Sequence, residues 1–164
     1  MARSSTFNVD EFLQTTINPE GQPFDTKISF VEDGEYPAEI MALSKRTVET
    51  DDRGDRELVE VTFNITDPDV QEKMNIDEPR ARMTIWLDNE SDGRLSLGRN
   101  KNVRLGQLLT AVGLNTGKPW SWGQLLHATC WVRTREPRNA EAAIMTDVAM
   151  VGRDRGSVER ASRR

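Results

Sequence analysis

The chain has 164 residues, of which 36% are hydrophobic and 30% charged, and its formal net charge is −5. This length accommodates one domain with extensions, and the apolar residues fall in short blocks, which excludes a membrane-spanning helix. The acidic balance argues against nucleic-acid binding through bulk positive charge, and the single cysteine, Cys130, excludes an intramolecular disulfide and a multi-cysteine metal site.

Residues 1–30 have the character of an extended N-terminal arm. A short amphipathic segment around Phe12 and Leu13 is followed by turn-forming residues, Asn18 to Pro23, that cannot continue a helix. We expect the apolar residues of the arm either to pack back on the domain or to dock on another subunit. No apolar core of a secretory signal follows Met1, so we expect the protein to stay in the cytoplasm where it is made.

Three segments after Gly34 alternate between apolar and polar residues, which is the pattern of half-buried β-strands. A turn-rich segment from Thr50 to Asp55 separates the first two, and a charged connection with a helical turn around Val70 to Met74 precedes the third. The residues expected to face the core are Tyr36, Ala38, Ile40 and Ala42, then Val59, Val61, Phe63 and Ile65, then Ala81, Met83, Ile85 and Leu87.

A helix and two further strands complete the expected domain. Apolar residues at helical spacing predict the helix, and Gly113 is placed to end it. A fourth strand is expected from His127 to Arg135, after a short helical turn at Gln124, and a fifth strand follows the turn at Pro137. The expected apolar faces are Leu105, Leu108, Leu109 and Val112 in the helix and Ile144, Thr146, Val148 and Met150 in the last strand.

The predicted order of elements, three strands, a helix and two strands, is that of an OB-fold, a partly open β-barrel that binds oligonucleotides or oligosaccharides. We therefore expect a mainly β protein with an OB-fold-like barrel over residues 31–151, with a β-sandwich as the alternative. Residues 152–164 contain five arginines and no apolar periodicity, which predicts a basic flexible tail.

No motif points to catalysis, a metal or a cofactor. His127 and Cys130 are expected on opposite faces of the fourth strand, so they form neither a nucleophile pair nor a shared metal site. Asp88, Glu90 and Asp92 have a calcium-like spacing but lack the remaining ligands of a calcium loop. The glycine patterns of nucleotide-binding loops are absent as well. We expect a binding protein that is not an enzyme.

Basic residues precede the expected helix at Arg99, Lys101 and Arg104. A helix N-terminus beside basic side chains can hold the backbone phosphate of a polymer. The alternative is that Asn102 caps the helix while the basic side chains are solvated.

The polar registers of the third and fourth strands place tryptophans beside arginines, which is the most informative feature of the sequence. Single-stranded nucleic acid is held without sequence preference by bases stacked on exposed aromatic rings and phosphates contacted by basic residues. The alternative is that the arm, neighbouring tryptophans or a second subunit cover the two rings. The predicted nucleic-acid-binding residues are Arg82, Trp86, Lys101, Arg104, Trp131, Arg133 and Arg135, with Lys45, Arg46 and Arg53 of the first hairpin extending the groove.

Several short segments between residues 24 and 151 resemble a small family of tailed-phage proteins, which is similar to phage OB-fold single-stranded DNA-binding proteins. The resemblance implies a viral gene whose product binds single-stranded DNA in the host cytoplasm and serves DNA replication. The segments that carry it are Phe24–Lys27, Glu32–Tyr36, Thr84–Asp88, Lys101–Gly106 and Gly117–Trp120.

The sequence departs from this pattern at its end. Replicative single-stranded DNA-binding proteins usually have an acidic tail that recruits other proteins, whereas this sequence ends in Ser162-Arg163-Arg164, which argues against a replication-hub role. One alternative is a capsid decoration or cement protein of the virion, which docks on the major capsid protein through the arm. Another is a small acidic β-domain that mimics DNA and acts on a host protein.

Overall fold

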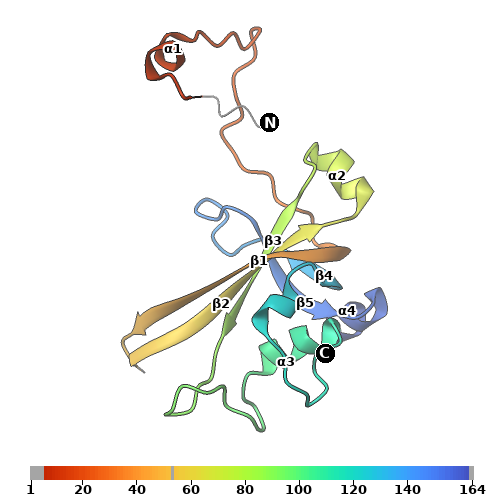
Figure 1. Cartoon of the computed structure of the whole chain (residues 1–164). Helices are drawn as coiled ribbons and strands as arrows, with labels where there is room; N and C mark the ends of the chain where they lie inside the picture. The colour runs from red at the N-terminus through yellow and green to blue at the C-terminus, as the bar shows by residue number, and fades with distance from the viewer. Residues whose placement is uncertain (1–5, 53, 163–164) are drawn as a thin grey trace.

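The computed structural model describes residues 6–52 and 54–162, with side chains described as far as Glu159. Within these ranges, five strands form one sheet that closes in a ring in the order β1-β2-β3-β5-β4 (Figure 1). The prediction of a mainly β protein with a helix between the third and fourth strands is confirmed. The strands are β1 (Gly34–Thr50), β2 (Gly54–Ile65), β3 (Arg80–Trp86), β4 (Thr129–Arg135) and β5 (Thr146–Gly152). The helical segments are α1 (Val9–Gln14), α2 (Pro68–Met74), α3 (Val103–Ala111), η1 (Trp122–Leu125) and α4 (Arg155–Ser162).

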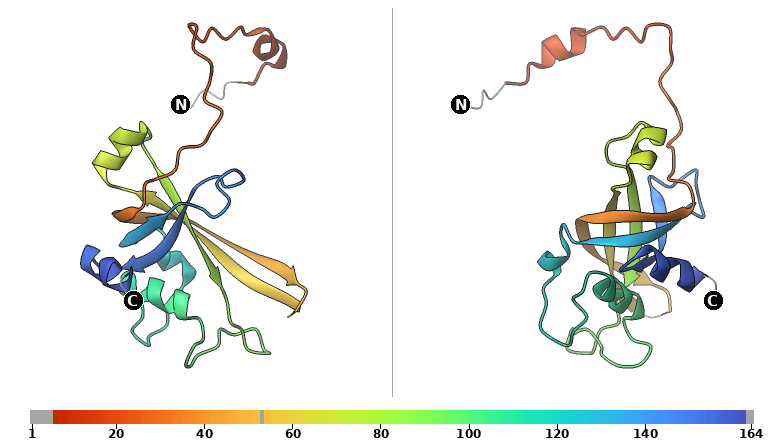
Figure 2. Two further views of the ribbon diagram at one scale, coloured as in Figure 1. Left: turned by 180° about the vertical axis from the view of Figure 1, so that it is seen from behind. Right: turned by 90° about the vertical axis from the view of Figure 1, so that its right-hand side faces the viewer.

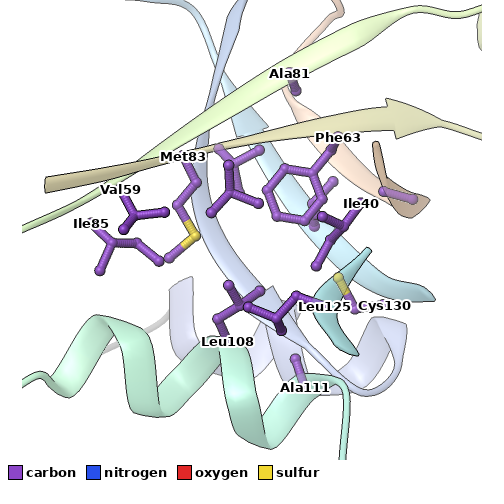
Figure 3. Close-up of a cluster of buried hydrophobic side chains, with 14 of the residues drawn as sticks. Ile40, Val59, Phe63, Ala81, Met83, Ile85, Leu108, Ala111, Leu125 and Cys130 are labelled. Carbon is purple, nitrogen blue, oxygen red and sulfur yellow. The ribbon is translucent and has the colours of Figure 1, made fainter. Parts of the chain in front are cut away.

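The interior of the closed sheet is filled by alternate side chains of each strand, because successive side chains of a strand point to opposite faces. All the core-facing residues predicted for the second and third strands, from Val59 to Ile65 and from Ala81 to Leu87, are buried. Figure 3 shows Leu108 of α3 directed toward these side chains, beside Leu125. Among the predicted core-facing residues of the helix, Leu105, Leu108 and Leu109 are buried, whereas Val112 is only half-buried.

A β-bulge in β1 changes which residues face the interior. The pairing of β1 with β2 shifts between Ile40 and Ala42, so that Met41 is an extra residue on β1. An extra residue reverses the faces that follow it. Ala42, which we expected to face the core, is therefore exposed, and Leu43 packs against the core in its place.

A second bulge lies in β5. Thr134 pairs with Val148 and Arg133 pairs with Met150, which leaves Ala149 as the extra residue. Val148 is buried as predicted, but Met150 lies opposite the outward-facing Arg133 rather than in the core. Ile144, the first residue of the predicted apolar face, precedes β5 and is exposed.

The two ends of the described chain behave differently. The arm departs from the closed sheet before Val31, which is buried and donates its backbone N–H to Thr146 Oγ1 at 2.8 Å, and it carries α1 away from the sheet (Figures 1 and 2). We expected a flexible tail from residue 152, but α4 packs against β5, β4 and β1, and its Val158 is buried. In the described part of the chain, no helix has the length and apolar character needed to cross a membrane.

Candidate nucleic-acid interface

The outward registers of β3 and β4 are as the sequence predicted. Arg82, Thr84 and Trp86 alternate with the buried Ala81, Met83 and Ile85 on β3. The same alternation on β4 sets Trp131, Arg133 and Arg135 against the buried Cys130, Val132 and Thr134. Both sets of side chains therefore lie on the outside of the closed sheet.

Trp86, at the end of β3, is the most accessible aromatic platform on the sheet. Its side chain is 41% exposed, and the guanidinium carbon of Arg56 lies 4.9 Å from the centre of its ring. Leu58 of β2 pairs with Trp86 in register, and although it faces outward it is only 1% exposed. A cation over an indole ring is attracted to its electron-rich face, so Arg56 helps to hold the ring in place while part of it stays accessible.

Arginines and a glutamate lie on the strands beside this ring. Arg46 of β1 lies opposite Leu58, and its guanidinium forms an ion pair with Glu60 at 3.0 Å. Arg82 is 3.9 Å from the same carboxylate. Both arginines therefore share the half-buried carboxylate of Glu60. We call this surface the Trp86 face, and it consists of Arg46, Arg56, Leu58, Glu60, Arg82 and Trp86.

Arg82 connects the Trp86 face to a second group of charged side chains around Asp147 of β5. Asp147 pairs in register with Arg82 on one side and with Arg135 on the other. From α3, Arg104 donates a hydrogen bond to the backbone carbonyl of Val148 at 2.7 Å. We call Arg82, Arg104, Arg135 and Asp147 the Asp147 cluster. It places three arginines around one carboxylate, so it is a local positive site on an acidic protein.

Burial perturbs Arg104 of this cluster. Removal from water lowers the pKa of Arg104, Arg135 nearby lowers it further, and Asp147 opposes both effects. The Nε atoms of Arg82 and Arg104 are buried, and neither has a hydrogen-bond partner among the described residues. A buried donor without a partner costs about 1–3 kcal/mol, which a bound water or anion would relieve.

The remaining predicted residues lie apart from Trp86. Trp131 is half-buried, and its register partner Gly152 is the residue against which Val158 of α4 packs. Arg133 forms an ion pair with Glu35 of β1. Lys101 lies in the loop before α3 and lines a hollow together with Arg56. Arg53 lies outside the described residues.

Asn102 stands at the N-cap position of α3, but its side chain does not cap the helix. Its Oδ1 accepts a hydrogen bond from the backbone of Asp88 at 2.8 Å, and its Nδ2 donates to the carbonyl oxygens of Asp88 at 2.8 Å and Ser96 at 3.0 Å. Asp88 in turn accepts from the backbone N–H of Asn102 at 2.9 Å. The alternative in which the Asn102 side chain caps the helix is thus wrong, and the residue instead ties the loop after β3 to the start of α3.

His127 and Cys130 are separated, as the sequence predicted, although for a different reason. His127 precedes β4 in a left-handed conformation, φ 66°, and its exposed ring lies 3.0 Å from Glu39. Cys130 is buried in the core, which raises the pKa of its thiol to about 12. Such a thiol is protonated and inert near neutral pH.

Asp92 of the calcium-like segment pairs with Arg94, and the described residues contain no group of three or more His, Cys, Asp or Glu placed to hold a metal ion.

The sequence reasoning missed Arg56 and Leu58, which support Trp86. No local pattern distinguishes them, because their relation to Trp86 depends on the register between β2 and β3.

The comparisons with known proteins add nothing to the site: no protein-family model matches the chain, and no curated protein shows significant similarity to it. Function is therefore inferred from the geometry of the described residues.

Proposed function

We propose that this protein binds single-stranded DNA without catalysis, with a base stacked on Trp86 and the phosphates held by the arginines of the Asp147 cluster. The observation that carries the proposal is the accessible ring of Trp86, 41% exposed and supported by Arg56, at one end of an outward strip that leads through Arg82 to Arg135. Aromatic rings beside basic side chains are how proteins hold single strands regardless of sequence.

The strand order supports the finer assignment of an OB-fold. In that fold, oligonucleotides bind to the face formed by strands 2 and 3 and to the loops joining strands 1 to 2 and 4 to 5. The Trp86 face lies mainly on β2 and β3, with Arg46 added from β1 near the β1–β2 hairpin. Arg135 and Asp147, which flank the connection from β4 to β5, belong to the Asp147 cluster. This correspondence with the binding surface of that fold class supports the proposal.

The dimensions of the strip suit a short stretch of single strand. Trp86 lies about 13 Å from Arg82 along β3, at roughly 3.3 Å per residue, and two strand spacings of about 4.8 Å lead on to Arg135. OB-folds contact between about 4 and 16 nucleotides, and a strip of this length accommodates the lower end of that range.

The other predicted residues are assigned supporting roles. Lys101 shares a hollow with Arg56, but the carboxylates of Asp55, Glu57, Asp88 and Glu90 also line it, so we expect a small contribution from Lys101. Arg133 and Trp131 continue the strip along β4, but the ion pair of Arg133 with Glu35 and the half-burial of Trp131 predict smaller contributions than that of Trp86. On the strength of the sequence resemblance, we assign the protein to a bacteriophage and to the replication of its DNA in the host cytoplasm.

A fluorescence titration of the wild-type protein tests the proposal. Poly-dT should quench the intrinsic tryptophan emission to saturation at low salt, and binding should weaken steeply as salt is raised, because each neutralised phosphate releases counterions. A duplex of equal length should bind much more weakly. The absence of any response to poly-dT at low salt would contradict single-strand binding.

The alternative function, docking on the major capsid protein in the virion, has one feature in its favour. The arm carries exposed apolar side chains, including Phe7, Phe12 and Phe24, that contribute nothing to the core. Removal from water of exposed apolar surface of this kind commonly drives protein association. A protein that ignores poly-dT but binds capsids through residues 1–30 would establish this alternative.

A further inference from the structure

The arm exposes far more apolar surface than a segment without a partner normally does. α1 contains no buried residue. The ring centres of Phe7 and Phe12 lie 5.4 Å apart, and among the described residues neither ring contacts another aromatic ring. An isolated helix of this length is unstable in water, and an amphipathic one is usually completed by an apolar groove. The exposed apolar residues of the arm, between 54% and 75% exposed, are Phe7, Val9, Phe12, Leu13, Ile17, Phe24 and Ile28.

A groove of matching character lies at the other end of the molecule. It has a volume of about 600 Å³ and runs between α3, the loop before it and the loop from Leu114 to Trp120. This volume falls within the range of about 300–1,000 Å³ found for ligand-binding pockets. Leu97 and Val103 on its lining are 91% and 54% exposed, so apolar side chains at the groove also lack a partner among the described residues.

The charges of the two surfaces are complementary. The first turn of α1 carries Asp10 and Glu11, and its last turn has no basic residue. The lining of the groove includes Lys101 and Lys118 and no acidic residue. Phe12 and Leu13 directly follow the acidic pair, so apolar side chains entering the groove would bring these carboxylates to its basic residues.

We propose that the groove binds α1 of a second copy of this chain, so that the protein self-associates by exchanging its N-terminal arms. The arm leaves the closed sheet at the end opposite α3, directed away from the groove of its own chain (Figures 1 and 2). The segment from Thr15 to Phe30 reaches up to about 50 Å when extended, which is enough to cross to a neighbouring molecule. Exchange of identical elements is a low-cost route to a dimer.

This interaction is separate from the proposed DNA binding, with which it shares only Lys101. Its test is therefore the oligomeric state in the absence of DNA, measured on the full-length chain by light scattering coupled to size exclusion over a range of protein concentration. The wild type is expected to be a dimer or larger that dissociates on dilution. High ionic strength should weaken this self-association less than it weakens DNA binding, because apolar contacts carry most of the interface.

Two variants remove the contact from opposite sides without touching the core. Phe12→Asp alters an exposed arm residue. Gly106→Trp adds a bulky side chain to α3 at a residue that lines the groove, and the Cβ that it adds would meet nothing within 4 Å. Each variant should weaken self-association at least tenfold. Ile144→Asp, an exposed apolar residue on another loop, is the matched control and should leave self-association unchanged.

Mixing the two variants distinguishes exchange between chains from other arrangements. Phe12→Asp retains an intact groove and Gly106→Trp retains an intact arm, so the mixed dimer has one intact arm–groove contact and should form more strongly than the dimer of either variant alone. A wild type that is monomeric at every concentration would overturn the proposal. This result would also be expected if the arm occupied the groove of its own chain. Self-association that is unaffected by Gly106→Trp would overturn it as well.

Discussion

Trp86 shows how far single residues are predictable in this protein. The alternation of β3 predicted that its side chain faces outward, and the structure confirms it. The stacking of Arg56 over the ring was not predictable, because Arg56 and Trp86 meet only through the register of β2 with β3. The same holds for the Asp147 cluster, in which β5 brings Arg82 and Arg135 to either side of one carboxylate.

Asn102 supports a testable expectation at the residue scale. Its side chain makes three hydrogen bonds that hold Asp88 and Ser96, and its backbone adopts φ 48°, which glycine tolerates and alanine does not. Asn102→Gly should therefore lower the free energy of unfolding by about 1–3 kcal/mol through the lost hydrogen bonds alone. Asn102→Ala should cost a further 1–2 kcal/mol, roughly, through backbone strain.

Urea denaturation of both variants measures these losses. Asn115→Ala is the matched control, since Asn115 is exposed and donates a single side-chain hydrogen bond, to Thr110, so it should change stability by less than about 0.5 kcal/mol. If Asn102→Gly were as stable as the wild type, the side chain would not be what holds the loop after β3 to α3.

At the scale of elements, the period-two pattern identified all five strands of the described chain, because the interior side of each is apolar. The pattern did not predict the bulges at Met41 and Ala149, since one extra residue reverses which side chains of the strand face the core without changing the composition.

The sequence pattern did not predict α4 either. Only Val158 anchors this otherwise polar helix in the described part of the chain, and one apolar residue gives no periodic signal.

The packing of α4 on the sheet depends on the absence of a side chain at Gly152. A Cβ there would lie 2.8 Å from Ser157 Cβ and 3.1 Å from Val158 Cγ1, closer than packed atoms approach. Gly152→Val should therefore push α4 away and destabilise the protein by about 1–3 kcal/mol. Tryptic cleavage after Arg155 should become faster, because the displaced helix is more accessible to protease.

Gly106→Ala is the control for this substitution, because a Cβ at Gly106 meets nothing within 4 Å and alanine favours the helix. It should leave both stability and cleavage near those of the wild type or slightly improved. Unchanged cleavage in Gly152→Val would show that α4 does not depend on this contact.

At the scale of the whole molecule, the charge distribution matters more than the net charge. The protein carries −5 overall, yet three arginines surround Asp147 and two more, Arg46 and Arg56, lie on the Trp86 face. If the proposed function is right, the acidic body should limit nonspecific attraction to duplex DNA, while the arginines of the strip and stacking on Trp86 would hold a single strand. Composition alone argued against nucleic-acid binding, and only the folded arrangement shows where the positive charge gathers.

The most direct test of this account is the affinity of Trp86→Ala for a labelled poly-dT oligonucleotide, measured by fluorescence anisotropy at low salt. Loss of one stacking platform should weaken binding by about 5- to 150-fold, equivalent to about 1–3 kcal/mol, with the far-ultraviolet circular dichroism unchanged. Lys27→Ala, which removes a positive charge from the arm rather than from the sheet, should bind nearly as the wild type does. Wild-type affinity in a folded Trp86→Ala variant would contradict the assignment of the Trp86 face as the binding surface.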